Sequence, residues 1–166
     1  AGPVEVYGYN NIGIANVDNH LNVRETPDES GKLVGKMSNN AACEVLGEEG
    51  DWIHIKSGKV EGYCHKDYLL TGVFARMRAE EIVTSVAEAT SGGLRVRTEP
   101  NTDCEIITTM AEGEYLEVVE VMDGWIKVLL DDEEAYISSE YAQVKENLDT
   151  AITMTELLYG EGVSDV

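Results

Sequence analysis

The sequence predicts an all-β protein in which a short helix joins two small β-barrels and a helical tail follows the second barrel. Three observations lead to this fold class: an internal repeat, apolar residues that alternate with polar ones, and turn-forming residues at short intervals. With 166 residues and 43% apolar content, the chain is long enough to form either one domain or two small ones. The repeat favours two.

The internal repeat aligns residues 21–69 with residues 94–142 at a constant offset of 73 and without a gap. The two copies share a Leu-x-Val-Arg motif, a proline, a methionine, a Trp-Ile pair and two tyrosines at equivalent positions. Most substitutions between the copies keep apolar character, as when Cys64 is matched by Ile137. Each copy is close to the smallest size at which a domain folds alone, so each is predicted to form its own core.

Short strands are predicted within each copy. Ile53 and Ile55 alternate with polar neighbours, and residues 117–121 are rich in β-branched side chains. Turn-forming residues separate such segments, for example at 27–31 and 47–51. Strands of this length at this spacing are typical of a small barrel.

The predicted domain boundaries follow from the repeat and the segments around it. The first barrel is expected over residues 1–70 and the second over residues 83–144. Residues 71–82 are rich in helix formers and lack proline, which predicts a short, rigid connecting helix. Residues 145–166 show apolar residues at loosely helical spacing and then Gly-Glu-Gly, so we expect a helical tail and a linker to a further, catalytic domain.

Composition excludes several classes of partner. Twelve basic and 32 acidic residues give a net charge of −20, which repels nucleic-acid phosphates and anionic lipid headgroups. The uncharged stretches are far shorter than the roughly 20 apolar residues of a membrane span. The first residues do not resemble a signal peptide, so a signal peptide either does not exist or has been removed. We therefore expect no nucleic acid and no membrane span.

The three cysteines form no CxxC pair, which argues against a disulfide scaffold and against a zinc site. At most one bridge can form within the chain, and the sequence leaves open whether Cys43 and Cys64 form it. The acidic run at residues 131–134 lacks the alternating oxygen ligands and the glycine of a calcium loop, so a solvated turn is expected there. No metal and no cofactor are predicted.

Both copies carry a motif set that resembles the bacterial SH3-like (SH3b) domain. The first copy shows Leu21-Asn22-Val23-Arg24, Pro27, Asp51-Trp52-Ile53, Gly62-Tyr63 and Tyr68-Leu69, and the second shows Leu94-Arg95-Val96-Arg97, Pro100, Gly124-Trp125-Ile126 and Ala135-Tyr136. The resemblance implies a secreted or cell-wall protein that binds peptidoglycan or its stem peptides. The whole arrangement resembles the N-terminal targeting region of NlpC-like cell-wall cysteine endopeptidases, so a hydrolase domain is expected after Val166.

The resemblance also gives candidate ligand-binding residues. The tryptophans could stack on a sugar or a peptide, or they could close the barrel core. The tyrosines suit a groove that holds a peptide backbone, or they could be structural. The arginines could bind a stem-peptide carboxylate, or they could hold a turn through a carbonyl or a salt bridge. The candidates are Arg24, Trp52, Tyr63, His65, Tyr68, Arg97, Trp125, Tyr136 and Tyr141.

The two copies differ in charge and in one family position. The first copy carries nine acids and six bases, whereas the second carries thirteen acids and three bases. The second also has Ala135 where the family has a glycine, together with the acidic turn at 131–134. These differences make the first copy the better match to an anionic wall.

Three functions are in competition. The leading one is a non-catalytic wall-binding module that targets a linked peptidoglycan hydrolase. The second is a cysteine endopeptidase that uses Cys43 or Cys104 with a histidine, although Cys43 matches Leu116 and is predicted to lie in apolar surroundings that raise its pKa. The third is a protein-binding adaptor, but the aromatic cluster of a proline-peptide groove is missing. No catalytic residue is therefore predicted in this chain.

Overall fold

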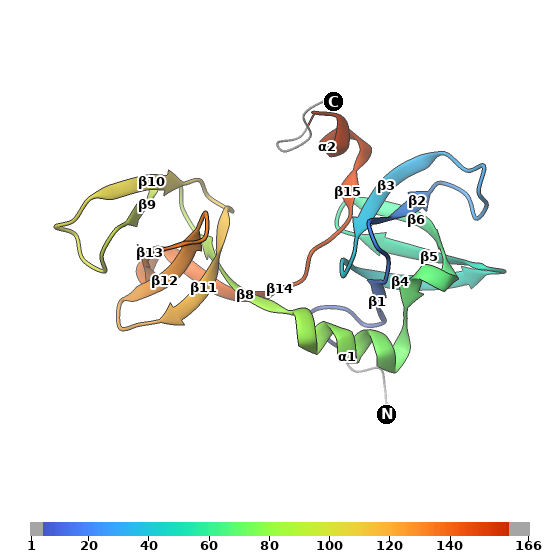
Figure 1. The fold of residues 1–166 in the computed structure, drawn as a ribbon, viewed down its shortest axis with the longest axis horizontal. Coiled ribbons are helices and arrows are strands. Elements are labelled where there is room, and N and C mark those ends of the chain that lie inside the picture. Colours follow the sequence, from blue (N-terminus) through green and yellow to red (C-terminus); the bar gives the residue numbers. More distant parts are fainter. Residues whose placement is uncertain (1–4, 160–166) are drawn as a thin grey trace. The chain divides into compact units, whose positions relative to one another are not determined.

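The computed structural model describes residues 5–159, which form two compact units. Unit 1 contains the described residues up to Val83 and those from Leu148 onward, and unit 2 is Thr84–Asn147. Strands dominate both units, as Figure 1 shows, and the predicted all-β fold class is confirmed. Within the described residues, no helix has the length and apolar character needed to cross a membrane.

The strands of unit 1 form one antiparallel sheet in the order β15-β3-β2-β6-β5-β4-β1-β7. A 3-10 turn, Lys66–Tyr68, precedes the last strand of the barrel. The strands are β1 (Ile12–Ala15), β2 (His20–Arg24), β3 (Leu33–Ser38), β4 (Ala42–Glu49), β5 (Trp52–Ser57), β6 (Val60–His65), β7 (Leu69–Leu70) and β15 (Ile152–Thr153).

Unit 2 repeats this strand order without a counterpart of β15: its sheet runs β10-β9-β13-β12-β11-β8-β14. A 3-10 turn, Ser139–Tyr141, again precedes the last strand. The internal repeat of the sequence is therefore also a repeat of topology. The strands are β8 (Thr84–Ala89), β9 (Leu94–Arg97), β10 (Ile106–Met110), β11 (Tyr115–Val121), β12 (Trp125–Leu130), β13 (Glu133–Ser138) and β14 (Ala142–Asn147).

Each unit has its own apolar core, built from equivalent positions. Because successive side chains of a strand point to opposite faces, alternate residues of the central strands are buried: Ile53, Ile55 and Ser57 in β5, and Ile126 and Val128 in β12. Burying one such aliphatic side chain contributes roughly 1.5–3 kcal/mol. Val23, Met37, Ile55 and Cys64 in unit 1 are matched by Val96, Met110, Val128 and Ile137 in unit 2.

The helix after the first repeat packs on unit 1. In α1 (Gly72–Ile82), the small side chains of Ala75 and Ala79 are buried in one cluster with Ile12 and Ile14 of β1. Small side chains let the helix lie close to the strand. The helix predicted at residues 71–82 is thus present, but its buried face makes it a part of unit 1.

The tail differs from the predicted boundary at residue 145. Strand β14 continues to Asn147, and the chain then returns to unit 1, where β15 pairs with β3. Between residues 145 and 159, only α2 (Met154–Tyr159) is helical. The extended segment before it forms because it pairs with the edge of β3, a long-range contact that local helical spacing does not reveal. The predicted linker at residues 160–166 lies outside the described residues.

Candidate functional site

Each unit has a groove at the same place in its fold, of about 550 Å³ in unit 1 and about 480 Å³ in unit 2. Most lining residues of one groove have a lining residue of the other as their partner at the repeat offset. The two barrels therefore have a groove at equivalent positions although their sequences differ. The paired lining residues are His20 and Gly93, Leu21 and Leu94, Asn22 and Arg95, Arg24 and Arg97, Glu29 and Thr102, Trp52 and Trp125, His65 and Ser138, Asp67 and Glu140, and Tyr68 and Tyr141.

The strand alternation places the groove tryptophans. Ile53 and Ile55 of β5 point into the core, so Trp52 points to the other face, where it is half-buried in the groove wall. Trp125 occupies the same position at the start of β12. The tryptophans therefore line the two grooves.

The 3-10 turn places the groove tyrosines. In unit 1 the backbone N–H of Asp67 donates to Nδ1 of His65 at 3.2 Å, which starts the turn that carries Tyr68. In unit 2 the backbone N–H of Glu140 donates to Oγ of Ser138 at 3.3 Å and the turn carries Tyr141. A histidine and a serine thus perform the same capping role, but they leave different surfaces in the groove.

An aromatic row forms one wall of the unit 1 groove. The ring centroids of Trp52 and His65 are 5.4 Å apart at 75°, and those of His65 and Tyr68 are 5.8 Å apart at 54°. Trp52 and His65 face each other across the β5–β6 ladder. Tyr68 is 51% exposed at the end of the row. Tilted rings in contact offer a ligand both apolar faces and polar edges.

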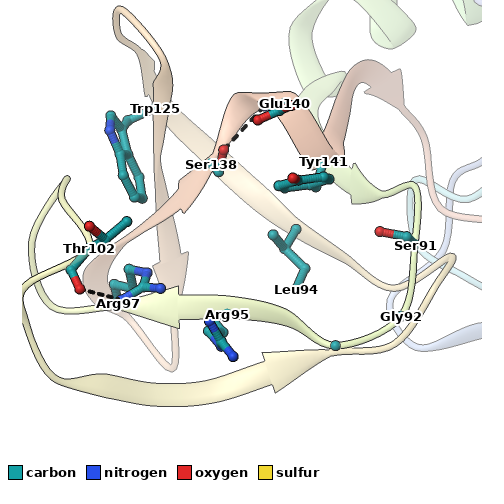
Figure 2. Close-up of a pocket in the computed structure, with 11 residues that line it drawn as sticks. Ser91, Gly92, Leu94, Arg95, Arg97, Thr102, Trp125, Ser138, Glu140 and Tyr141 are labelled. Carbon is teal, nitrogen blue, oxygen red and sulfur yellow. Dashed lines mark hydrogen bonds between the residues drawn. The ribbon is translucent and has the colours of Figure 1, made fainter.

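The corresponding wall of unit 2 is interrupted. Figure 2 shows Trp125 and Tyr141 with Ser138 between them, and the serine hydroxyl cannot extend the ring surface. Among residues 5–159, every pair of contacting aromatic rings lies in unit 1. Unit 2 instead places a second arginine, Arg95, beside Arg97 in its groove.

The arginines at matching positions of the two copies, Arg24 and Arg97, hold the loops that follow β2 and β9. Nη1 of Arg24 donates to the carbonyl oxygen of Gly31 at 3.1 Å, and Nη1 of Arg97 donates to that of Thr102 at 3.4 Å. Arg97 is only 8% exposed. Because a guanidinium has five N–H donors, one loop contact leaves further donors on each arginine.

Two predicted site residues lie outside the grooves. Tyr63 stacks on His54 at 4.8 Å, and hydrogen bonding to Glu49 raises its pKa. Tyr136 lies under Nζ of Lys127 at 5.9 Å from the ring centroid. Both tyrosines share a strand face with a groove residue, but they lie two residue pairs further along the ladder, a step of about 7 Å. The alternation of residues in the sequence predicts which face of the strand a tyrosine occupies, but it does not predict how far along that strand the groove extends.

Sequence reasoning also missed groove residues of β2 and β9. His20 and Asn22 line the unit 1 groove, and Arg95 lines that of unit 2. The alternation in β2 could have identified these residues: Leu21 and Val23 are buried, and successive side chains of a strand point to opposite faces, so their neighbours point outward. Because Asn22 and Arg95 differ in type, the comparison of the two copies did not single them out.

The cysteines do not form a reactive centre in unit 1. Cys43 and Cys64 are free thiols in the core, and desolvation raises the pKa of both, to about 12 for Cys64. Cys104 belongs to unit 2, where its Sγ lies 3.3 Å from the carbonyl oxygen of Asn101. Within residues 5–159, no group of three histidine, cysteine or acidic side chains is placed to hold a metal ion. A buried, protonated Cys43 cannot act as a nucleophile.

Known proteins similar to this chain include one from Bacillus subtilis strain 168 and several solved structures. The first is named "Putative N-acetylmuramoyl-L-alanine amidase YrvJ" and is 27% identical over 121 residues, which are 73% of this chain and 23% of that protein. The chain thus spans about a quarter of that relative's length.

Two of the similar solved structures bear NlpC names. An NlpC/P60 family protein from Bacillus cereus ATCC 10987 is 11% identical, with 82% of this chain and 57% of that chain covered and a TM-score of 0.38. NlpC2 from Trichomonas vaginalis is 18% identical, with 80% and 47% covered and a TM-score of 0.32.

The family comparison covers both repeats. A sequence model of the bacterial SH3 domain matches residues 19–69 and residues 92–143, and these two segments contain most of the residues that line the two grooves. Together they make up more than half of the chain. This chain therefore belongs to the bacterial SH3 domain family, with two copies of the domain.

Proposed function

We propose that the chain is a non-catalytic module that binds peptidoglycan stem peptides through its two grooves and holds a linked hydrolase at the cell wall. The observation that carries this proposal is the recurrence of one groove, with its tryptophan, tyrosine and arginine, at equivalent positions of both units. In this proposal the protein acts outside the cell. Membership of the bacterial SH3 family and the amidase name of the B. subtilis relative support it.

The groove residues suit a short peptide with free carboxylates. Aromatic side chains hold an extended peptide by stacking and by their polar edges. Arginine binds carboxylates through paired N–H donors. Arg24 in unit 1, and Arg95 with Arg97 in unit 2, supply such donors at the groove surface. No reacting group is required of this chain, because binding alone raises the local concentration of an attached enzyme.

Two grooves on one chain strengthen binding to a repetitive polymer. Once one groove is occupied, the second meets its ligand at an effective concentration set by the chain itself. The overall affinity for the wall can then exceed that of either groove by a factor of roughly 100 or more, provided that both grooves reach stem peptides together. Weak individual grooves are therefore compatible with firm attachment.

The test is co-sedimentation of the whole chain with purified peptidoglycan sacculi. We expect the unmodified protein to sediment with sacculi and the W52A/W125A double variant to stay in solution. The matched control is Y63F/Y136F, because these residues lie outside both grooves and keep their rings in this variant. Full retention of W52A/W125A on sacculi, or absence of the unmodified protein from the pellet at low salt, would contradict the proposal.

A further inference from the structure

The two sheets differ at one edge. In unit 1, β15 pairs with Gly35 and Lys36 of β3 and covers part of that edge (Figure 1). The counterpart of β3 in unit 2 is β10, which pairs with β9 and, within residues 5–159, is an edge strand. Edge strands present unpaired backbone N–H and C=O groups, which form a template for another extended segment.

The occupied edge of unit 1 shows how such a segment is held. Ile152 pairs with Lys36 and Thr153 with Gly35 in antiparallel register. Ala151, 7% exposed, enters the unit 1 core, and its backbone N–H donates to Oγ of Ser57 at 2.8 Å. Backbone pairing, one small apolar side chain in the core and one buried polar anchor therefore hold the segment.

The open edge of unit 2 keeps the backbone template but changes the side chains. Residues 106–110 carry no charge and no proline, which are the usual protection of an exposed edge. Ile106 is 45% exposed and Ile107 is 46% exposed. Leu130, half-buried, stands where unit 1 has the buried anchor Ser57. This edge is thus more apolar than the one that β15 covers.

The acidic turn of the β12–β13 hairpin supplies a charge at the same edge. In unit 1 the equivalent turn lies beside the bound tail, because a Cβ built on Gly58 would be 2.9 Å from Oγ1 of Thr150. The matching positions of unit 2 begin at Asp131 and Asp132, which have φ values of 50° and 67°, and continue with Glu133 and Glu134. A segment that followed the path of the tail would therefore pass Asp131, which stands where unit 1 has Gly58, at one end of this acidic turn; at the other end Glu134 forms an ion pair with Lys127.

We propose that the open edge of β10 binds an extended segment of another protein, which adds an antiparallel strand and carries apolar and basic residues. The occupant is not a second copy, because each copy has a net charge of −20 and the acidic turns would face like charge. It is not the segment 160–166, which has two acids and no base. This surface is separate from the grooves, so the inference goes beyond the proposed wall binding.

The first experiment uses two labelled peptides and the whole chain. One peptide is Lys-Lys-Thr-Ala-Ile-Thr-Lys-Lys, and the other has the chain's own residues 149–155, Asp-Thr-Ala-Ile-Thr-Met-Thr. We expect the basic peptide to shift the NMR amide signals of residues 106–110 and 131–134 and to slow hydrogen exchange in β10. The acidic peptide should bind at least about tenfold more weakly, because it faces like charge.

Two variants test the charge requirement. D131N/D132N removes two charges and keeps residues that tolerate a positive φ, and it should weaken the basic peptide about threefold to tenfold. E117Q/E146Q changes the net charge equally at exposed positions on β11 and β14, and it should leave binding within about twofold.

Three outcomes would overturn the proposal. The first is no shift of residues 106–110 by the basic peptide. The second is equal binding of both peptides, which would remove the role of charge. The third is concentration-dependent dimerisation with exchange protection of β10, seen by sedimentation, which would assign the edge to a second copy. The peptide experiments do not depend on sacculus binding by W52A/W125A. Failure of this inference can therefore be distinguished from failure of the proposed function.

Discussion

Units 1 and 2 share a strand order, a core and a groove, but their grooves offer different chemistry. In unit 1, Trp52, His65 and Tyr68 form a continuous aromatic wall beside a single arginine. In unit 2 the aromatic wall is interrupted by Ser138, and two arginines line the groove. The shared scaffold therefore presents a continuous aromatic surface in one unit and two cationic side chains in the other.

The comparison also changes what charge implies. The second copy is the more acidic, and the sequence favoured the first copy for an anionic wall on that ground. The groove of unit 2, however, contains Arg95 and Arg97 against Glu140 alone, whereas Arg24 in unit 1 is accompanied by Glu29 and Asp67. Since screening limits exposed charges to about 8 Å at physiological salt, the charges of the groove weigh more than the total of the domain.

The largest expected difference between the units is thiol reactivity. Cys43 and Cys64 of unit 1 are buried, and at pH 8 a pKa of about 12 leaves Cys64 roughly one part in ten thousand ionised. Cys104 of unit 2 has a lowered pKa: desolvation raises it, but hydrogen bonding, to which Thr98 and Arg97 contribute, outweighs this. Ellman's reagent at pH 8 should label one thiol at least about 1000 times faster than the other two.

The C104S variant is the control for this labelling, because it should abolish the fast phase alone. Fast reaction of two or more thiols would show that the unit 1 core is open. The raised pKa also has a consequence for stability: the protonated Cys64 stabilises the fold below pH 9, and this contribution is lost as the pH rises from 9 through 12. Unit 1 should accordingly unfold at alkaline pH before unit 2, as hydrogen exchange can show.

Exchanging glycine and alanine at matching positions should change the free energy of unfolding of the two barrels by different amounts. A Cβ on Gly62 would collide with the carbonyl oxygen of Arg24 and lie 3.0 Å from Cγ1 of Val23, whereas the methyl group of Ala135 is accommodated in the unit 2 core. G62A should destabilise unit 1 by about 2 kcal/mol through overpacking. A135G should destabilise unit 2 by about 1 kcal/mol through lost burial. Amide exchange resolved by unit measures both, and a neutral G62A would disprove the tight contact.

Single tryptophan variants should show which groove depends on stacking. W52A removes the start of a continuous wall, so we expect about tenfold weaker binding to sacculi, against about threefold for W125A. Raising the salt concentration should increase the difference, because the charge-dependent groove of unit 2 loses affinity. Equal losses at low and high salt would mean that the grooves bind in the same way.

The smallest expected effects come from exchanging the residue at the centre of the wall. H65S should weaken sacculus binding about twofold to threefold, and S138H should strengthen it by a similar factor, since one aromatic contact contributes about 0.5–1.5 kcal/mol. Both residues accept a hydrogen bond from the following turn, so either exchange keeps the cap. Circular dichroism checks the fold, and a weaker S138H would contradict the interpretation.

Much of the fold was predictable because it depends on local patterns. The alternation around Ile53 and the turn at Gly50, together with their repeat at residues 94–142, gave the strands, the number of barrels and the family. The candidate site was predictable in part: Trp52, Tyr68 and Arg24 line a groove, but Tyr63 lies further along the same sheet face. Strand period assigns a side chain to a face, whereas the reach of a groove depends on how neighbouring loops close over it.

By itself, the sequence determined the repeat, the all-β class, the apolar core positions and the tryptophan, tyrosine and arginine of each groove. Tertiary structure alone decided that the tail returns to pair with β3, that α1 belongs to unit 1, and that β10 keeps an open edge. The physical reason is range. Patterns among neighbouring residues predict strands and core positions. The pairing of Ile152 with Lys36, in contrast, joins segments that are more than a hundred residues apart in the sequence.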